Sequence, residues 1–186
     1  MAVRRIVYSN EPMLHEPSRR VRRVDAKLEE LIEDMIETMH AANGIGLAAI
    51  QIGVPERVVV IEVPVVRDED SVPSEEPPET ELYVLINPEI VEVSEELAEG
   101  IEGCLSIPGW AGEVERHVGV TVEGLDREGR PVRVHAEGLL ARVFQHEVDH
   151  CEGVLFIDHI EDPEKIWSVE EGQEEAAEAA QERPSG

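Results

Sequence analysis

The segment His146-Glu147-Val148-Asp149-His150 decides how this chain is interpreted. It matches the pattern H-E-x-x-H. On a helix, positions i and i+4 lie on one face, so both imidazoles can bind one metal ion while Glu147 lies beside them. The segment therefore predicts a helical metal site with a carboxylate next to it.

The residues around this segment predict an amphipathic helix over 138–151, ended by Gly153. Its apolar stripe follows the spacing i, i+4, i+7, i+11 through Leu139, Val143, His146 and His150. The histidines thus continue the apolar stripe, and imidazoles that point into a core need polar partners. A shared metal ion is one solution, and hydrogen bonds to other protein groups are the alternative.

The opposite side of this helix carries Arg142, Gln145, Asp149 and Glu152, and we expect it to be solvated. We expect one exception, an ion pair between Asp149 and Arg116 that fixes the orientation of the helix. The alternative is that Asp149 is a solvated carboxylate.

Two histidines leave the predicted site one protein ligand short of a catalytic centre. Metalloproteases with an extended motif carry a third histidine where this chain has Phe156, so that class is excluded. A glutamate of the acidic tail is one candidate for the third ligand. Another is Cys104, in Glu102-Gly103-Cys104-Leu105-Ser106, because a thiolate beside a glycine can approach a metal closely. The alternative for Cys104 is an inert buried thiol.

A third segment, Gly44-Ile45-Gly46-Leu47-Ala48-Ala49-Ile50-Gln51, is rich in small residues. It is not a dinucleotide-binding loop, because no strand precedes it and the third glycine is missing. Its small residues allow close approach to a site, and the Gln51 amide can donate a hydrogen bond there.

Length and patterning predict a single α+β domain. The chain has 186 residues, of which 41% are hydrophobic, enough for a core without disulfides. We expect one domain over residues 1–168, with an acidic surface loop at 67–81, and a disordered acidic tail at 169–186. Beside the histidine helix we expect a helix over 25–44 and strands over 58–63, 82–93, 114–125 and 132–136.

The charge excludes several classes of partner. The formal net charge is −26, so the surface repels phosphate backbones, and neither nucleic acid nor an anionic membrane is an expected partner. We find no transmembrane stretch and no secretory signal, and the two cysteines are too few for a disulfide framework. We therefore expect a cytoplasmic protein.

Together, G-I-G-L-A-A-I-Q, E-G-C-L-S and Q-H-E-V-D-H, in this order, resemble peptide deformylase from about residue 3 to residue 160. The resemblance implies an α+β fold in which β-sheets pack around a central helix that carries the two histidines. It implies a hydrolase that removes the formyl group from the N-terminal formyl-methionine of new polypeptides.

The resemblance also implies roles for individual residues. Cys104, His146 and His150 would bind the metal, and Glu147 would be the general acid and base. Gln51 and the backbone N–H of Leu105 would form the oxyanion hole. The family typically uses Fe(II), while Zn(II) or Ni(II) can occupy such a site in purified protein.

Selectivity requires an apolar pocket for methionine and strand-like pairing with the peptide backbone. We expect the pocket to be formed by Ile45, Ile86, Leu139 and Val143, although Ile86 could equally belong to the sheet core. Gly46 and Gly103 are available for backbone pairing.

This chain departs from the common pattern of the family in three places. Cys151 follows the second histidine where many relatives have leucine, and we interpret it as a packing residue. Gly109-Trp110-Ala111 stands where some relatives have a substrate-contacting arginine. Some relatives dock a basic C-terminal helix on the ribosome. The tail of this chain is acidic, so we do not expect the ribosome as a partner on the basis of the resemblance.

Two other functions stay open at this point. One is a different metallo-hydrolase with the same centre, such as a peptidase. The other is a non-catalytic module that only holds a metal.

Overall fold

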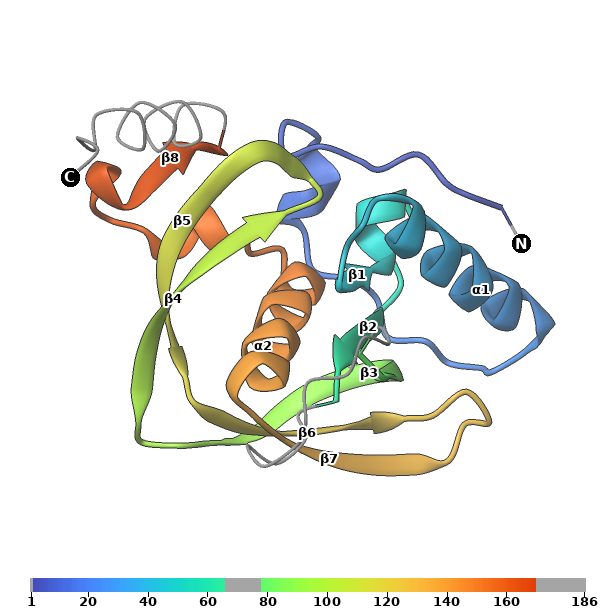
Figure 1. Cartoon of the computed structure of the whole chain (residues 1–186). Helices are drawn as coiled ribbons and strands as arrows, with labels where there is room; N and C mark the ends of the chain where they lie inside the picture. The colour runs from blue at the N-terminus through green and yellow to red at the C-terminus, as the bar shows by residue number, and fades with distance from the viewer. Residues whose placement is uncertain (1, 66–77, 170–186) are drawn as a thin grey trace.

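The computed structural model describes residues 2–65 and 78–169. Two antiparallel sheets enclose a helix, α2, so the predicted α+β fold with a central histidine-bearing helix is confirmed (Figure 1). The strands in chain order are β1 Gly46–Ala48, β2 Val58–Pro64, β3 Thr80–Val93, β4 Leu97–Cys104, β5 Ile107–His117, β6 Gly119–Leu125, β7 Pro131–Glu137 and β8 Ile166–Ser168. The helices are α1 Ala26–Ala41 and α2 Gly138–Glu152, with 3-10 turns at Pro12–His15, Ala49–Ile52, Phe156–His159 and Pro163–Lys165.

The strand order explains how the two sheets surround α2. The larger sheet has the order β1-β2-β3-β6-β7, and the smaller one β4-β5-β8. In Figure 1, β4 and β5 rise on one side of α2, while the larger sheet lies on its other side. Helix α2 therefore lies in the core between the sheets. None of the helices in the described residues is long and apolar enough to cross a membrane.

Helix α1 forms where its periodicity predicts. Asp25 caps it, because the side chain accepts hydrogen bonds from the backbone N–H groups of Lys27 and Leu28. The apolar face that includes Ile32 and Met35 is fully buried, in a cluster with residues of β1 and β2. Burial of this face stabilises the helix and covers the larger sheet.

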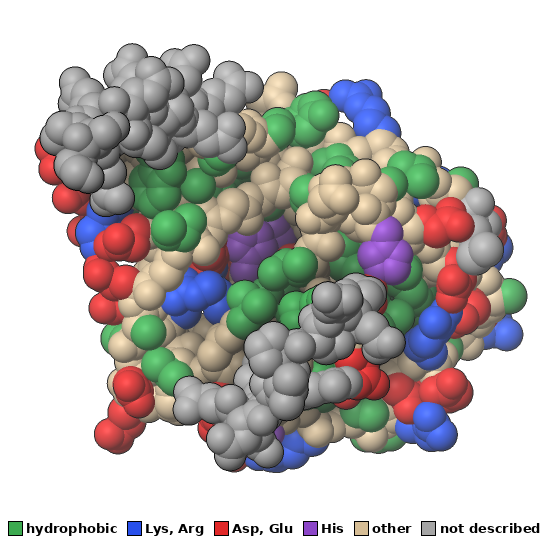
Figure 2. Space-filling view, in the orientation of Figure 1, with side chains coloured by type: hydrophobic (Ala, Val, Ile, Leu, Met, Phe, Trp, Pro, Cys, Tyr) green, Lys and Arg blue, Asp and Glu red, His purple; other side chains and the backbone are tan. Residues whose placement is uncertain are grey.

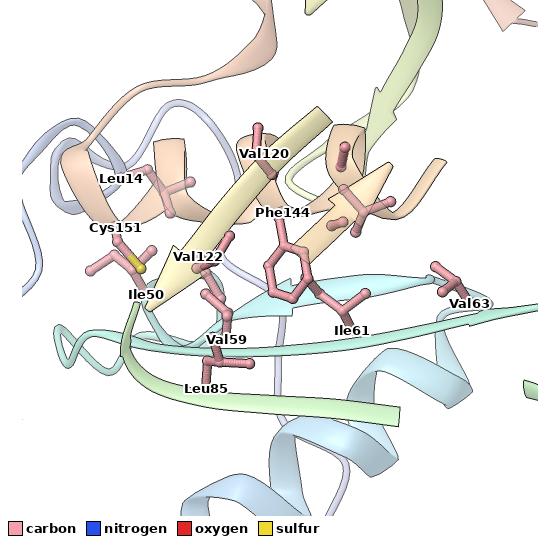
Figure 3. Packing of buried hydrophobic residues seen from close by; sticks show 14 residues of the cluster. Leu14, Ile50, Val59, Ile61, Val63, Leu85, Val120, Val122, Phe144 and Cys151 are labelled. Atoms are coloured by element: carbon pink, nitrogen blue, oxygen red, sulfur yellow. The ribbon is translucent and has the colours of Figure 1, made fainter. Parts of the chain in front are cut away.

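Helix α2 ends at Gly153, as predicted, with Gly153 in the left-handed region at φ 77°. Its apolar face contributes Phe144, which is completely buried among Val59, Ile61 and Val122 (Figure 3). Cys151 is also completely buried in this cluster, so its interpretation as a packing residue is confirmed.

Three of the four predicted strands are observed with small extensions, as β2, β3 and β7. The prediction of one strand over 114–125 is wrong, because the strand is interrupted at Val118: β5 ends at His117 and β6 begins at Gly119. Residues before the break pair with β4 in the smaller sheet, and residues after it pair with β3 and β7 in the larger sheet. A single valine-rich segment therefore contributes a strand to each of the two sheets.

The predicted acidic loop 67–81 extends too far at its end. Thr80 and Glu81 belong to β3, where Thr80 is paired with Pro64 and donates a hydrogen bond to Glu62. Residues 66–77 of this region, and residues 170–186 of the predicted tail, lie outside the described residues.

Candidate metal centre

Three potential metal ligands meet between the smaller sheet and α2. Cys104 is the last residue of β4, and His146 and His150 are one turn apart on α2. Their ligand atoms all lie within 4.8 Å of one another, and the Cys104 sulfur is 3.3 Å from Nε2 of His150. One thiolate and two imidazoles form a donor set that suits a divalent transition metal and leaves a fourth position open.

The environment of the imidazoles also fits a cation. Nδ1 of His150 is buried and has no hydrogen-bond partner among the described residues. Burial lowers the pKa of His150 well below its usual value, which favours the neutral form that binds metals. Burial opposes protonation of His146 too, but contacts with Cys104 and Glu102 raise its pKa well above the usual value. A cation that binds these donors displaces that proton.

Glu102 orients one of the two imidazoles. Its carboxylate accepts a hydrogen bond from Nδ1 of His146 at 2.9 Å, so Nε2 of that ring is left to bind a metal ion. Arg116 donates two hydrogen bonds to the same carboxylate, at 2.9 and 3.0 Å. Burial would raise the pKa of Glu102, but the hydrogen bonds from His146 and Arg116 lower it to about 2. Glu102 is therefore a buried carboxylate ion.

Glu147 lies beside the donors with an unpaired oxygen. Its side chain is buried, Oε2 has no hydrogen-bond partner among the described residues, and burial raises its pKa to about 7. A carboxyl group with this pKa can both accept and release a proton near neutral pH. Gly46 of β1 makes room for it, because a Cβ atom there would lie 2.3 Å from Oε1 of Glu147.

Gln51 is held in a fixed position close to the sulfur. It lies in the 3-10 turn after β1, and its Oε1 accepts a hydrogen bond from the backbone N–H of Ala48 at 2.9 Å. Its Nε2 donates to Oγ of Ser106 at 3.2 Å and toward Sγ of Cys104 at 3.5 Å. The amide nitrogen of Gln51 therefore donates toward one ligand of the centre, Cys104, and is held in place by Ser106.

A cavity of about 470 Å³ opens beside the centre and is lined by residues of all three sequence motifs. In Figure 2 a histidine side chain lies deep in this hollow, with hydrophobic side chains around the opening. Of the residues predicted for binding or catalysis, the lining includes Ile45, Gly46, Gln51, Gly103, Cys104, Leu105, Leu139, Val143, His146 and Glu147.

Ile86 does not belong to this group. It is completely buried in the cluster between α1 and the larger sheet, and is not among the residues that line the cavity. Its position in β3, paired with Val58 of β2, directs it into the sheet core. The prediction of Ile86 as a pocket residue is therefore wrong, and the sheet-core alternative is correct.

Two residues assigned to the solvated side of α2 are in fact engaged. Arg142 also lines the cavity, and donates hydrogen bonds to Glu102 and to the backbone carbonyls of Ala98 and Val114. Gln145 is buried and exchanges two hydrogen bonds with the backbone of His117. Because β4 and β5 cover this part of α2, Arg142 and Gln145 bond to strands instead of water. Glu152, at the end of the helix, is exposed as predicted.

The predicted pair of Asp149 and Arg116 is confirmed, with Nη1 donating to Oδ2 at 2.6 Å. Sequence reasoning missed Glu102 as the partner of His146, and it missed Ile101, Trp110 and Arg142 in the cavity wall. Glu102 had one usable signal, since an acidic residue two positions before a predicted metal ligand is well placed to contact another ligand.

A thiolate, two imidazoles and a buried carboxyl group at the end of a cavity define the chain as a one-metal hydrolase. The sequence model of the polypeptide deformylase family matches residues 3–166. The chain belongs to this family, whose enzymes remove the N-formyl group from nascent peptides.

Individual relatives agree with this assignment. A peptide deformylase of Thermomicrobium roseum is 49% identical over 180 residues, which cover 97% of this chain and 98% of the relative. The crystal structure of peptide deformylase from Ehrlichia chaffeensis has a TM-score of 0.77 and 34% identity, with 100% of both chains covered.

A class I type b enzyme from Acinetobacter baumannii, solved with Met-Ala-Ser bound, has a TM-score of 0.76 and 36% identity over 86% of this chain and 99% of its own. Neither a peptidase nor a non-catalytic metal-holding module finds support in these comparisons.

Proposed function

We propose that Cys104, His146 and His150 hold one divalent cation, natively Fe(II), and that Zn(II) or Ni(II) can take its place in purified protein. The observation that carries this proposal is the convergence of one sulfur and two imidazoles within 4.8 Å, beside the buried carboxyl group of Glu147. When bound, such a cation acts as a Lewis acid and makes water available as a nucleophile near neutral pH.

We propose that Glu147 moves the proton in the reaction. Its pKa of about 7 allows it to take a proton from the attacking water and later give it to the leaving amine. Its burial next to the cavity places this proton transfer out of contact with bulk water. The products are formate and a free N-terminus.

Gln51 and the backbone N–H of Leu105 are our candidates for the oxyanion hole. The hydrogen bonds that fix the Gln51 amide mean that it does not have to reorganise as negative charge develops. Preorganised donors of this kind contribute about 3 kcal/mol each to the stabilisation of a transition state.

The methionine side chain of the substrate would enter the apolar part of the cavity, between Ile45, Leu139 and Val143. Gly46 and Gly103 would pair with the backbone of the formylated nascent peptide. The Acinetobacter baumannii enzyme, solved with Met-Ala-Ser bound, supports a peptide product of this kind. We propose a cytoplasmic enzyme. Its large negative charge supports one that binds neither nucleic acid nor anionic membranes, and we do not propose that it docks on the ribosome.

The experiment is a formate-release assay with formyl-Met-Ala-Ser on protein purified without oxygen, together with analysis of the bound metal. We expect formate, intact Met-Ala-Ser and about one metal ion per chain. Glu147→Gln should keep the metal and lose about 10²- to 10⁴-fold in kcat. Cleavage of a peptide bond, or release of formate by a metal-free protein, would refute the proposal.

A further inference from the structure

The N-terminal segment concentrates positive charge in a chain that is otherwise strongly acidic. Residues 2–27 carry seven of the 16 arginines and lysines of the chain, against three carboxylates. Six of these cations line one groove of about 900 Å³ at the start of α1: Arg4, Arg19, Arg20, Arg22, Arg23 and Lys27. We call it the arginine groove. Among the described residues it shares no lining residue with the cavity at the metal centre.

Ion pairing separates these cations from the others. Every arginine and lysine of residues 28–65 and 78–169 pairs with a carboxylate of the chain. In the groove the same holds for Arg4 and Arg20. The other four have no carboxylate within ion-pair distance in the part of the chain that the structure describes: Arg19, Arg22, Arg23 and Lys27. The chain has 42 acidic residues, so a shortage of carboxylates does not explain these unpaired charges. They are available to an anion from outside the chain.

The backbone that carries the arginines is fixed. The side chain of Asn87 accepts a hydrogen bond from the backbone N–H of Val21 at 2.7 Å and donates one to the carbonyl of Val21 at 2.9 Å. The backbone N–H of Arg19 donates to the carbonyl of Pro55 at 2.9 Å. Val21 and Val24 pack against the cluster beneath α1, and the two arginines between them are exposed. The segment therefore does not have to be ordered when a partner binds.

The rest of the lining indicates the kind of anion. It includes three carboxylates, and it also includes the apolar side chains of Val21, Leu28, Leu31 and Val54. None of the described residues that line the groove is aromatic, so the groove offers no surface on which nucleic acid bases stack. The carboxylates also repel the closely spaced phosphates of a nucleic acid chain. A polypeptide in which acidic residues are separated by apolar ones matches this mixed lining.

We propose that the arginine groove binds an acidic segment of another protein, whose carboxylates pair with Arg19, Arg22 and Arg23. A guanidinium group binds a carboxylate with two parallel N–H donors. The net charge of −26 does not prevent this, because charges are screened beyond about 8 Å at physiological ionic strength and the nearby arginines dominate. Each exposed pair strengthens binding only about 1.5- to 5-fold, so the affinity depends on several arginines together. A partner bound here leaves the cavity at the metal centre open to substrate.

The test measures binding of a fluorescent peptide of repeated Glu-Leu-Glu-Ala units to the full chain. The control peptide has glutamine in place of every glutamate. The groove variant is Arg22→Ser, Arg23→Ser, and because both side chains are exposed we expect it to fold, which circular dichroism checks. The control variant is Arg133→Ser, Lys165→Ser, which removes the same charge from two exposed residues outside the groove that already pair with carboxylates.

We expect the groove variant to bind the glutamate peptide about tenfold more weakly than the wild type and the control variant do. The glutamine peptide should not bind, and formate release should be the same in all three proteins. Equal affinity of the groove variant and the wild type would overturn the inference, as would absence of binding up to about 1 mM peptide. Tighter binding of a single-stranded RNA oligonucleotide would overturn it in favour of a nucleic acid site. Displacement of the peptide by an equal concentration of inorganic phosphate would overturn it in favour of a small-anion site.

Discussion

Nδ1 of His146 lies 2.9 Å from Oε2 of Glu102, so a strand residue holds a helix residue in the orientation that metal binding needs. The same carboxylate is bound by Arg116, which also pairs with Asp149 on the next turn of α2. Cys104 follows Glu102 by two residues on the same strand. One buried ion cluster therefore fixes β4 and α2 together and, with them, the sulfur and the imidazole rings.

Replacement of Glu102 by glutamine should weaken metal binding about 10- to 100-fold, because the charge that orients His146 is lost. It should also destabilise the fold by about 3 kcal/mol, since the buried positive charge of Arg116 would then be paired with only one carboxylate, that of Asp149. Metal retention against a chelator and urea unfolding measure the two effects. The control is Glu99→Gln on the same strand, where the carboxylate pairs with Lys165 at the surface and a near-neutral effect is expected. Unchanged metal retention in Glu102→Gln would contradict the positioning role.

Replacement of Gly46 by alanine should reduce catalysis without loss of the metal. The added Cβ would lie 2.3 Å from Oε1 of Glu147, so the carboxylate must move away from its position. A displacement of about 1 Å costs about 100-fold in rate. Formate release and metal content are the measurements. Gly119→Ala is the control, because its Cβ would meet no atom closer than 3.7 Å. Full activity in Gly46→Ala would show that the position of Glu147 is not critical.

The two glycines at the ends of α2 should differ in their tolerance of alanine. Both have positive φ, 58° at Gly138 and 77° at Gly153, so each substitution carries a conformational cost of about 1 kcal/mol. A Cβ at Gly138 meets no atom within 4 Å, whereas one at Gly153 would lie 2.7 Å from the backbone carbon of His15. We therefore expect Gly153→Ala to lose at least twice as much unfolding free energy as Gly138→Ala. Equal losses in urea unfolding would mean that the chain near His15 moves aside freely.

The elements that could be predicted are those with a local pattern. The spacing of apolar residues defines α1 and α2, and the β-branched run at Val58 defines β2. Strand β4 was not predicted, because Leu97–Cys104 contains two glycines and two glutamates. It is a strand because it pairs with β5, an interaction between residues distant in the sequence.

The same distinction applies to the site. Its three motifs can be recognised in the sequence, because residue type and spacing carry the chemistry. The partners of those motifs cannot, since Glu102 meets Arg116 and His146 across separations of 14 and 44 residues. Ile86 shows why a pocket residue can be predicted wrongly. An apolar residue in a strand has the same sequence pattern whether it lines a cavity or packs against a helix, as Ile86 does.

The stability of the chain should depend on Asp34 at neutral pH and not in acid. This buried carboxylate of α1 accepts hydrogen bonds from Nε of Arg4 at 2.7 Å and from the backbone N–H of Ala2 at 2.6 Å. The hydrogen bond from Arg4 lowers the pKa of Asp34 despite the opposing effect of burial. A lowered pKa means that the stabilisation is present above the unfolded-state value of about 3.9 and disappears as the pH falls through the folded-state value.

We therefore expect Asp34→Asn to lower Tm by about 4 °C at pH 7, and the difference from the wild type to shrink steadily below pH 4. Thermal unfolding followed by circular dichroism over pH 2–8 measures this. Glu30→Gln, at an exposed position of the same helix, is the matched control and should change Tm little at any pH. A Tm difference for Asp34→Asn that persists unchanged at pH 2 would contradict a contribution from the charged carboxylate, because the unfolded chain takes up the proton of Asp34 below about pH 3.9 and the difference must then shrink.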